Sequence, residues 1–155
     1  MALSMAALTV VTAAHAQSAP RKPGLWEITT TMTQPAPTRA GAPANGMSTV
    51  SQVCATKEEF DKYGTFKPRM DASCQLADIV KHGNDMTANL VCSGRMKGQG
   101  TLESISTDSE HTHSKAHFTG VVQMGADSHP LEWTSESTAV FKSADCGAVK
   151  SVQLK

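Results

Sequence analysis

The sequence has no excess of either charge, since 14 lysines and arginines balance 14 aspartates and glutamates among 155 residues. Proteins that bind nucleic acid draw most of their affinity from clustered basic side chains, so this balance argues against nucleic acid as a partner. Aromatic residues are also scarce, at 5% of the chain. A chain poor in aromatic residues and rich in serine and threonine favours short β-strands around a modest core.

Long apolar runs are absent after residue 16, so the mature chain offers no run of the roughly 20 apolar residues that a membrane span needs. The first 16 residues carry no charged side chain, and their apolar run from Leu3 to Ala14 leads into Ala14-His15-Ala16. This small-x-small ending is typical of a signal peptide cleaved after Ala16. A short buried helix is the alternative. We therefore expect residues 1–16 to direct export.

Motifs of catalysis and of cofactor binding are missing. No serine lies in a G-x-S-x-G elbow, and the chain has neither a P-loop nor a dinucleotide fingerprint. The acidic pair Glu58 and Glu59 falls in the first turn of a predicted helix, where carboxylates already complement the helix dipole. We expect a protein that is not an enzyme and that needs no cofactor.

Four cysteines follow the predicted signal peptide, an even number that predicts disulfides in an oxidising compartment: Cys54, Cys74, Cys92 and Cys146. No C-x-x-C pair is present, which disfavours the alternative of a zinc site. Three pairings are possible, and spacing alone does not choose between them. A hairpin folded about Gly83 places Cys74 and Cys92 nine residues from the turn on either side. This symmetry favours Cys74–Cys92, which leaves Cys54–Cys146.

Alternation of apolar and polar residues predicts the strands. In residues 24–33, Trp26, Ile28 and Met32 share one face, with Trp26 as a core anchor or, less favoured, a surface for stacking a ligand. Thr56 and Glu59 fit a capping box that begins a helix over residues 57–63. Further strands are predicted at 48–54, in both arms of 74–92, and at 95–106, 111–124 and 129–142. Within 95–106, Gly98 and Gly100 indicate a bulge or a close backbone approach.

These elements predict an all-β fold with one short helix. The fold is an antiparallel meander of about seven strands, either an open sheet or barrel-like, stapled by disulfides. Residues 34–47 hold three prolines and two glycines, so we expect a long loop there, either a plain connection or the mouth of a site. The predicted organisation is a signal peptide (1–16), a flexible lead-in (17–23), a single β domain (24–147) and a tail (148–155).

Three histidines in the strand 111–124 form the sharpest chemical pattern. His111, His113 and His117 share one face with Lys115, because residues two and six apart in a strand point the same way. His111 and His113 have a workable separation for two ligands of one metal ion, which a carboxylate such as Glu136 or Glu103 would have to complete. The charge of Lys115 would repel a cation, so we favour a solvated polar face over a metal site.

The chain resembles the family known as domain of unknown function 3617, small exported proteins of Gram-negative bacteria. The resemblance rests on residues 22–27 (KPGLWE), residues 53–56 (VCAT), the cysteines of the hairpin, residues 96–100 (MKGQG) and the closing Asp145-Cys146. It covers residues 22–147 and implies a periplasmic β domain with four cysteines, while implying no activity. The three histidines are not part of it.

The sequence therefore predicts a non-catalytic periplasmic domain that binds either a small apolar ligand or an envelope partner. No ligand-binding residue can be named from the sequence. Two alternatives stay open: a metal-binding protein that uses His111 and His113, and an interaction protein that pairs with a partner through an edge of its sheet.

Overall fold

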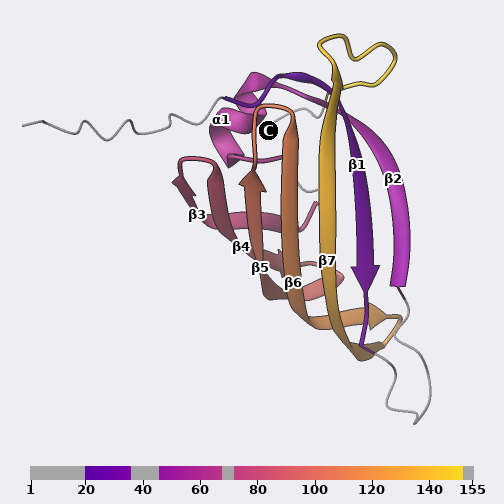
Figure 1. Ribbon diagram of the computed structural model, residues 1–155. Coiled ribbons are helices and arrows are strands. Elements are labelled where there is room, and N and C mark those ends of the chain that lie inside the picture. The colour runs from indigo at the N-terminus through magenta and orange to yellow at the C-terminus, as the bar shows by residue number, and fades with distance from the viewer. Residues whose placement is uncertain (1–19, 36–45, 68–71, 152–155) are drawn as a thin grey trace, which may run out of the picture.

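The computed structural model describes residues 20–35, 46–67 and 72–151, and its strands form one open antiparallel sheet in the order β2-β1-β7-β6-β5-β4-β3 (Figure 1). The predicted fold class is confirmed, and the sheet takes the open form of the two that were expected. The predicted signal peptide and most of the loop at 34–47 lie outside the described residues. The elements are β1 (Gly24–Thr33), β2 (Gly46–Ala55), α1 (Lys57–Tyr63), β3 (Cys74–His82), β4 (Asp85–Ser93), β5 (Met96–Ser106), β6 (His111–Met124) and β7 (Asp127–Ser143).

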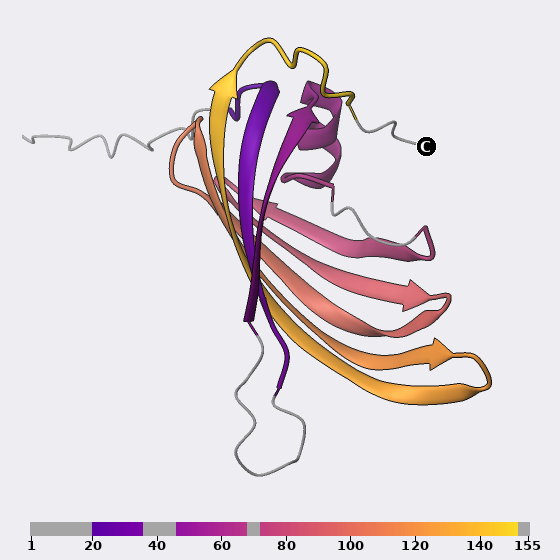
Figure 2. The same cartoon turned by 90° about the vertical axis from the view of Figure 1, so that its right-hand side faces the viewer.

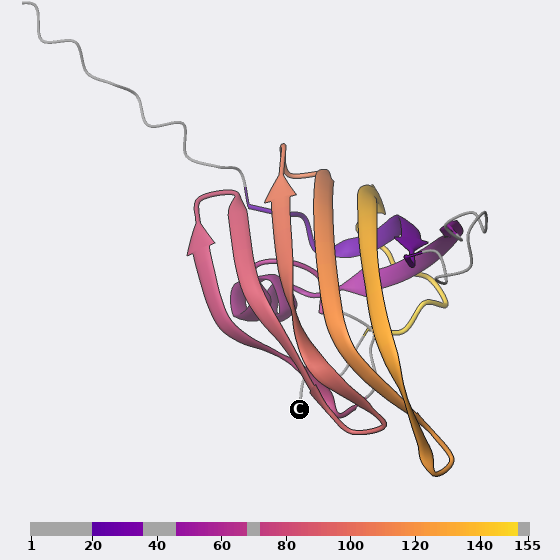
Figure 3. The ribbon, with the colours of Figure 1, turned by 90° about the horizontal axis from the view of Figure 1, so that it is seen from below.

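The topology combines a meander with an added hairpin. Strands β3 to β6 each pair with the next strand in the chain, and β1 pairs with the far side of β7, which leaves β2 outermost. The two edges of the sheet are therefore β2 and β3, and α1 lies between them in the chain. The sheet is strongly curved, with α1 on its concave side (Figure 2). Seen from below, α1 lies behind the strands of the meander (Figure 3).

The cysteine hairpin contains a bulge that the sequence did not reveal. His82 pairs with Asp85 across a two-residue turn, a register that would place Cys74 opposite Ser93 if the ladder were regular. Instead, Asp78 and Ile79 together face one residue of β4, and this extra residue moves Cys74 opposite Cys92. The prediction placed Cys74 and Cys92 at equal distances from Gly83 and so found the correct partner. It did so because the two-residue turn shifts the pairing by one residue and the bulge shifts it back.

Three glycines let β5 and β6 approach closely. A Cβ on Gly100 would lie 2.0 Å from the carbonyl oxygen of His117, and one on Gly120 would lie 2.1 Å from that of Lys97. A Cβ on Gly98 would lie 2.2 Å from the carbonyl oxygen of Thr119. The register between β5 and β6 is continuous, so the glycines serve a close approach and not a bulge.

The short helix has the caps that its sequence predicts. The Thr56 side chain accepts a hydrogen bond from the Glu59 amide at 3.1 Å, and Gly64 ends the helix with φ +70° and donates to the Phe60 carbonyl at 2.8 Å. The Glu59 side chain is buried, and its Oε1 accepts a hydrogen bond from the Lys67 amide at 2.6 Å. Glu59 thus connects the helix to the segment that follows it.

The core contains two aromatic centres and a third, aliphatic cluster of Met86, Ala88 and Leu102. Trp26 is fully buried, as expected of an anchor, and its ring packs edge-on against Phe60, Phe66 and Phe141. At the second centre, Phe118 stacks on Trp133 with ring centroids 5.6 Å apart. A cavity on the concave face adjoins both centres through Phe66 and Trp133.

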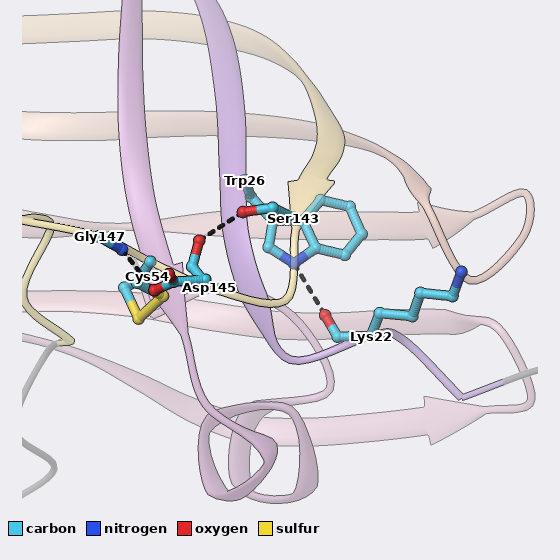
Figure 4. Close-up of a disulfide and its surroundings, with 7 residues drawn as sticks. Lys22, Trp26, Cys54, Ser143, Asp145 and Gly147 are labelled. Carbon is cyan, nitrogen blue, oxygen red and sulfur yellow. Dashed lines mark hydrogen bonds between the residues drawn. A yellow bond between two sulfur atoms is a disulfide. The ribbon is translucent and has the colours of Figure 1, made fainter.

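The second disulfide joins Cys54, at the end of β2, to Cys146 beyond β7 (Figure 4). The structure thus contains the two pairs that the hairpin argument favours. Beside it, the Trp26 indole donates to the Lys22 carbonyl at 2.9 Å (Figure 4). Ser151, within the predicted tail, forms a parallel bridge with Cys54, so the chain stays attached to β2 beyond the disulfide.

Candidate functional site

A cavity of about 480 Å³ lies on the concave face of the sheet. Side chains from all seven strands, from α1 and from the segment after α1 line it. This volume is within the range of small-molecule pockets. Most of its wall is apolar, and the main contributors are Ile28, Met32, Leu90, Met96, Leu102 and Trp133.

Methionines contribute to this wall from two different strands. Met32 comes from β1 and Met96 from the start of β5, and both are only partly buried. An unbranched thioether side chain adapts its shape to irregular apolar surfaces. The wall can therefore adjust to ligands that differ in outline.

Four of the hydroxyl groups in the cavity wall, those of Thr30, Thr65, Ser114 and Ser137, bind other hydroxyl groups of the protein. Thr30 and Ser137 are 2.9 Å apart across β1 and β7. Ser104 bonds both to Thr65 at 2.8 Å and to Ser114 at 3.0 Å, which links the segment after α1 to β5 and β6. Among the described residues, no buried side-chain nitrogen or oxygen lacks a partner. These four hydroxyls therefore need no hydrogen bond from a ligand, and an apolar molecule can lie against them without leaving them unpaired.

Two charged residues line the end of the cavity next to α1. Glu59 is 3% exposed and is held by the Lys67 amide described above, and Lys67 itself also lines the cavity. A buried carboxylate needs partners to offset its desolvation, and this backbone donor is one of them. The cavity is thus polar at one end and apolar along most of its length.

Arg21 connects the end of α1 to β5 and to the β3–β4 turn by hydrogen bonds. Its guanidinium donates to the Ser106 hydroxyl, to the Gly64 carbonyl at the end of α1, and to the Asn84 carbonyl in the β3–β4 turn. Burial lowers the pKa of the Arg21 side chain from its ordinary value. Arg21 lies in the segment expected to be a flexible lead-in, yet it joins three distant parts of the chain. The sequence offered no signal for these contacts, because they depend on tertiary packing.

The predicted histidine face lies on the opposite, convex side of the sheet. His111 Nδ1 lies 2.9 Å from Asp108 Oδ2, and His117 Nε2 lies 3.1 Å from Glu132 Oε1. Lys115 Nζ lies 2.9 Å from Glu136 Oε1. The backbone amide of Glu110, and next the His111 side chain, lower the pKa of Asp108 by hydrogen bonding to its carboxylate.

A second hollow, of about 460 Å³, lies on this convex side and includes Lys115, His117, Glu103 and Glu136 in its lining. In the described part of the chain, no group of three or more His, Cys, Asp or Glu residues could hold a metal ion. Of the two candidate metal ligands, His111 is exposed and bound to Asp108, and His113 is half-buried. The arrangement is that of cross-strand charge pairs on a solvated surface.

We predicted no ligand-binding residue from the sequence, so none of the residues that line the cavity was expected. The alternation in β1 does place Ile28, Thr30 and Met32 on one face, which is the face that lines the cavity. Alternation predicts a shared face, but it does not predict that the sheet curves enough to enclose a space. The loop at 34–47, predicted to be either a plain connection or the mouth of a site, is described only at its ends.

These features define a class of protein: an open, curved antiparallel sheet with one short helix, two disulfides and an apolar cavity on its concave face. Residues 21–146 match the family described as protein of unknown function (DUF3617), and the chain belongs to this family. The resemblance noted in the sequence is thereby confirmed. No curated protein and no solved structure matches the chain. In the described part of the structure, no helix is both long and apolar enough to cross a membrane.

Proposed function

We propose that this protein is a non-catalytic periplasmic domain that binds a small apolar ligand in the cavity of its concave face. The observation that carries the proposal is the cavity itself, about 480 Å³ with a largely apolar wall. Apolar lining with a few polar groups at one end is typical of small-molecule sites. The two disulfides are consistent with an exported protein in an oxidising compartment. The absence of a catalytic motif from the sequence supports binding without chemistry.

The first test is to identify what the protein carries. Protein purified from its native periplasm, without detergent, is extracted with organic solvent, and the extract is analysed by mass spectrometry. We expect an apolar small molecule in the extract at a constant ratio to protein. Its absence, together with failure of the purified protein to bind an apolar fluorescent dye, would contradict the proposal.

A matched pair of variants locates the binding. Ser135 and Thr134 are neighbours on β7, with Ser135 lining the cavity and Thr134 exposed on the convex face. Ser135→Phe fills part of the cavity, so we expect dye affinity to fall at least about tenfold, a loss of about 1.4 kcal/mol. Thr134→Phe adds the same ring outside the cavity and should leave affinity unchanged. Equal affinity in both variants would place the site elsewhere.

A further inference from the structure

The outer edge of β2 is open along most of its length. Within the described residues, no strand other than β1 pairs with β2, and every residue from Gly46 to Gln52 is exposed. β2 stands at the margin of the sheet in Figure 1. In the part of the chain that the structure describes, this edge carries a single bridge, between Cys54 and Ser151. The free stretch therefore ends just before Cys54.

β2 also lacks the features that usually keep an edge strand from pairing. Between Gly46 and Ala55 it contains no charged residue, no proline and no register shift against β1. Met47 and Val50 are each 65% exposed. The opposite edge, β3, contains the bulge at Asp78 and the charge of Lys81, both of which discourage pairing. The two edges thus differ in their readiness to accept another strand.

We propose that β2 pairs in antiparallel fashion with β2 of a second copy of this chain, around a two-fold axis at Val50. Residues that lie opposite each other in an antiparallel pair have their side chains on the same face of the sheet. If the concave faces of both copies are to lie on the same side, the two-fold axis must therefore pass between the two copies of one residue. With Val50 on the axis, residues 47–53 of each copy pair, and Cys54 keeps its bridge to Ser151. The two Val50 side chains then cover each other on the convex face.

The composition of β2 suits a copy of itself better than a charged partner. Every pair in this register joins uncharged residues, so two identical strands meet without the repulsion that like charges would cause. The register pairs Val50 with Val50, Thr49 with Ser51, Ser48 with Gln52, and Met47 with Val53.

The pairing would also extend the site. Met47 lies opposite Met32 in the register with β1, which places it on the concave face, and Val53 lines the cavity. In the dimer, Met47 of one copy lies beside Val53 of the other, so each copy adds an apolar side chain next to the other's cavity. This extension rests on the proposed ligand binding, but the pairing of the edges does not.

The test measures the mass of the full chain in solution by sedimentation velocity across a range of concentrations. The wild type should form a dimer. Val50→Lys and Val50→Glu each place like charges at the axis, so each should raise the dissociation constant at least about tenfold. An equimolar mixture of the two variants should restore the dimer, because opposite charges then meet. This recovery requires both variants to be folded. Val80→Lys, on the β3 edge, is the matched control and should leave the dimer intact.

Three results would overturn the proposal. The first is a wild type that stays monomeric at every concentration, as expected if the edge receives a strand from another protein. The second is a dimer that persists in Val50→Lys, and the third is a mixture of the two variants that remains monomeric. Dye binding measured on the same samples separates this question from ligand binding: a monomer that binds the dye refutes the pairing alone.

Discussion

At the scale of single residues, the convex face pairs opposite charges across neighbouring strands. The Lys115 ammonium donates a hydrogen bond to the Glu136 carboxylate, and this bond and its charge lower the pKa of Glu136. Because the folded-state pKa is lowered, the stabilisation is complete above the ordinary pKa of a glutamate and is lost as the pH falls through the lowered value. Both side chains are exposed, so the effect on the free energy of unfolding is small and the pKa is the better observable.

We predict that Lys115→Met raises the pKa of Glu136 towards its ordinary value. The substitution removes the hydrogen bond and the charge while keeping the length of the side chain. The measurement is an NMR titration of the side-chain carboxyl carbons. Lys142→Met is the control, since Lys142 pairs with Glu27 at 3.0 Å and not with Glu136. An unchanged pKa of Glu136 in Lys115→Met would show that the pair does not form in solution.

The residues of this face were predictable, but their partners were only partly so. Alternation alone placed His111, His113 and Lys115 together on one side of a strand. It also made Glu136 a candidate neighbour, since an adjacent strand was expected. That Lys115 lies directly opposite Glu136 depends on the register between β6 and β7, and the alternation within one strand does not determine that register.

At the scale of elements, three glycines allow the backbones of β5 and β6 to lie close together. Gly98 and Gly100 in β5 and Gly120 in β6 each occupy a position where a Cβ would meet a carbonyl oxygen of the other strand. The same region holds Phe118, whose ring lies on Trp133 beside the cavity. The close approach of β5 and β6 therefore lies next to the aromatic pair of which Trp133 lines the cavity.

We predict that Gly100→Ala destabilises the protein by about 3 kcal/mol, because the added methyl group would lie 2.0 Å from the His117 carbonyl oxygen and the backbones would have to separate. Urea unfolding measures the loss. Gly46→Ala provides the control: nothing lies within 4 Å of the added Cβ, so stability should change by less than about 0.5 kcal/mol. Equal stability of the two variants would show that β5 and β6 can separate at little cost.

The elements themselves followed closely from the sequence, whereas their irregularities did not. The predicted strand at 111–124 and helix at 57–63 have the bounds that the structure gives. Gly98 and Gly100 correctly indicated a close approach. The bulge at Asp78 and Ile79 carries no such signal, because neither residue is a glycine or a proline, and it becomes visible only from the register with β4.

At the scale of the whole molecule, the sequence left the choice between barrel and open sheet undecided. Closure would require β2 and β3 to pair, and the structure instead places them at opposite edges of the sheet with α1 between them in the chain. Whether two edges meet depends on the summed twist and curvature of seven strands, which no local pattern determines. The open edge of β2 and the accessible cavity both follow from this lack of closure.

The disulfides should contribute unequally to the stability of this open fold. Cys54–Cys146 joins residues 92 apart and Cys74–Cys92 joins residues 18 apart, so loop entropy predicts between about 4 and 5 kcal/mol for the first and about 3 kcal/mol for the second. We predict that replacing Cys54 and Cys146 by alanine lowers the free energy of unfolding more than replacing the hairpin pair, as measured by urea unfolding. Each double alanine variant serves as the control for the other. A larger loss from the hairpin pair would show that packing around the buried Cys92, and not restriction of the unfolded chain, sets the contribution of each bridge.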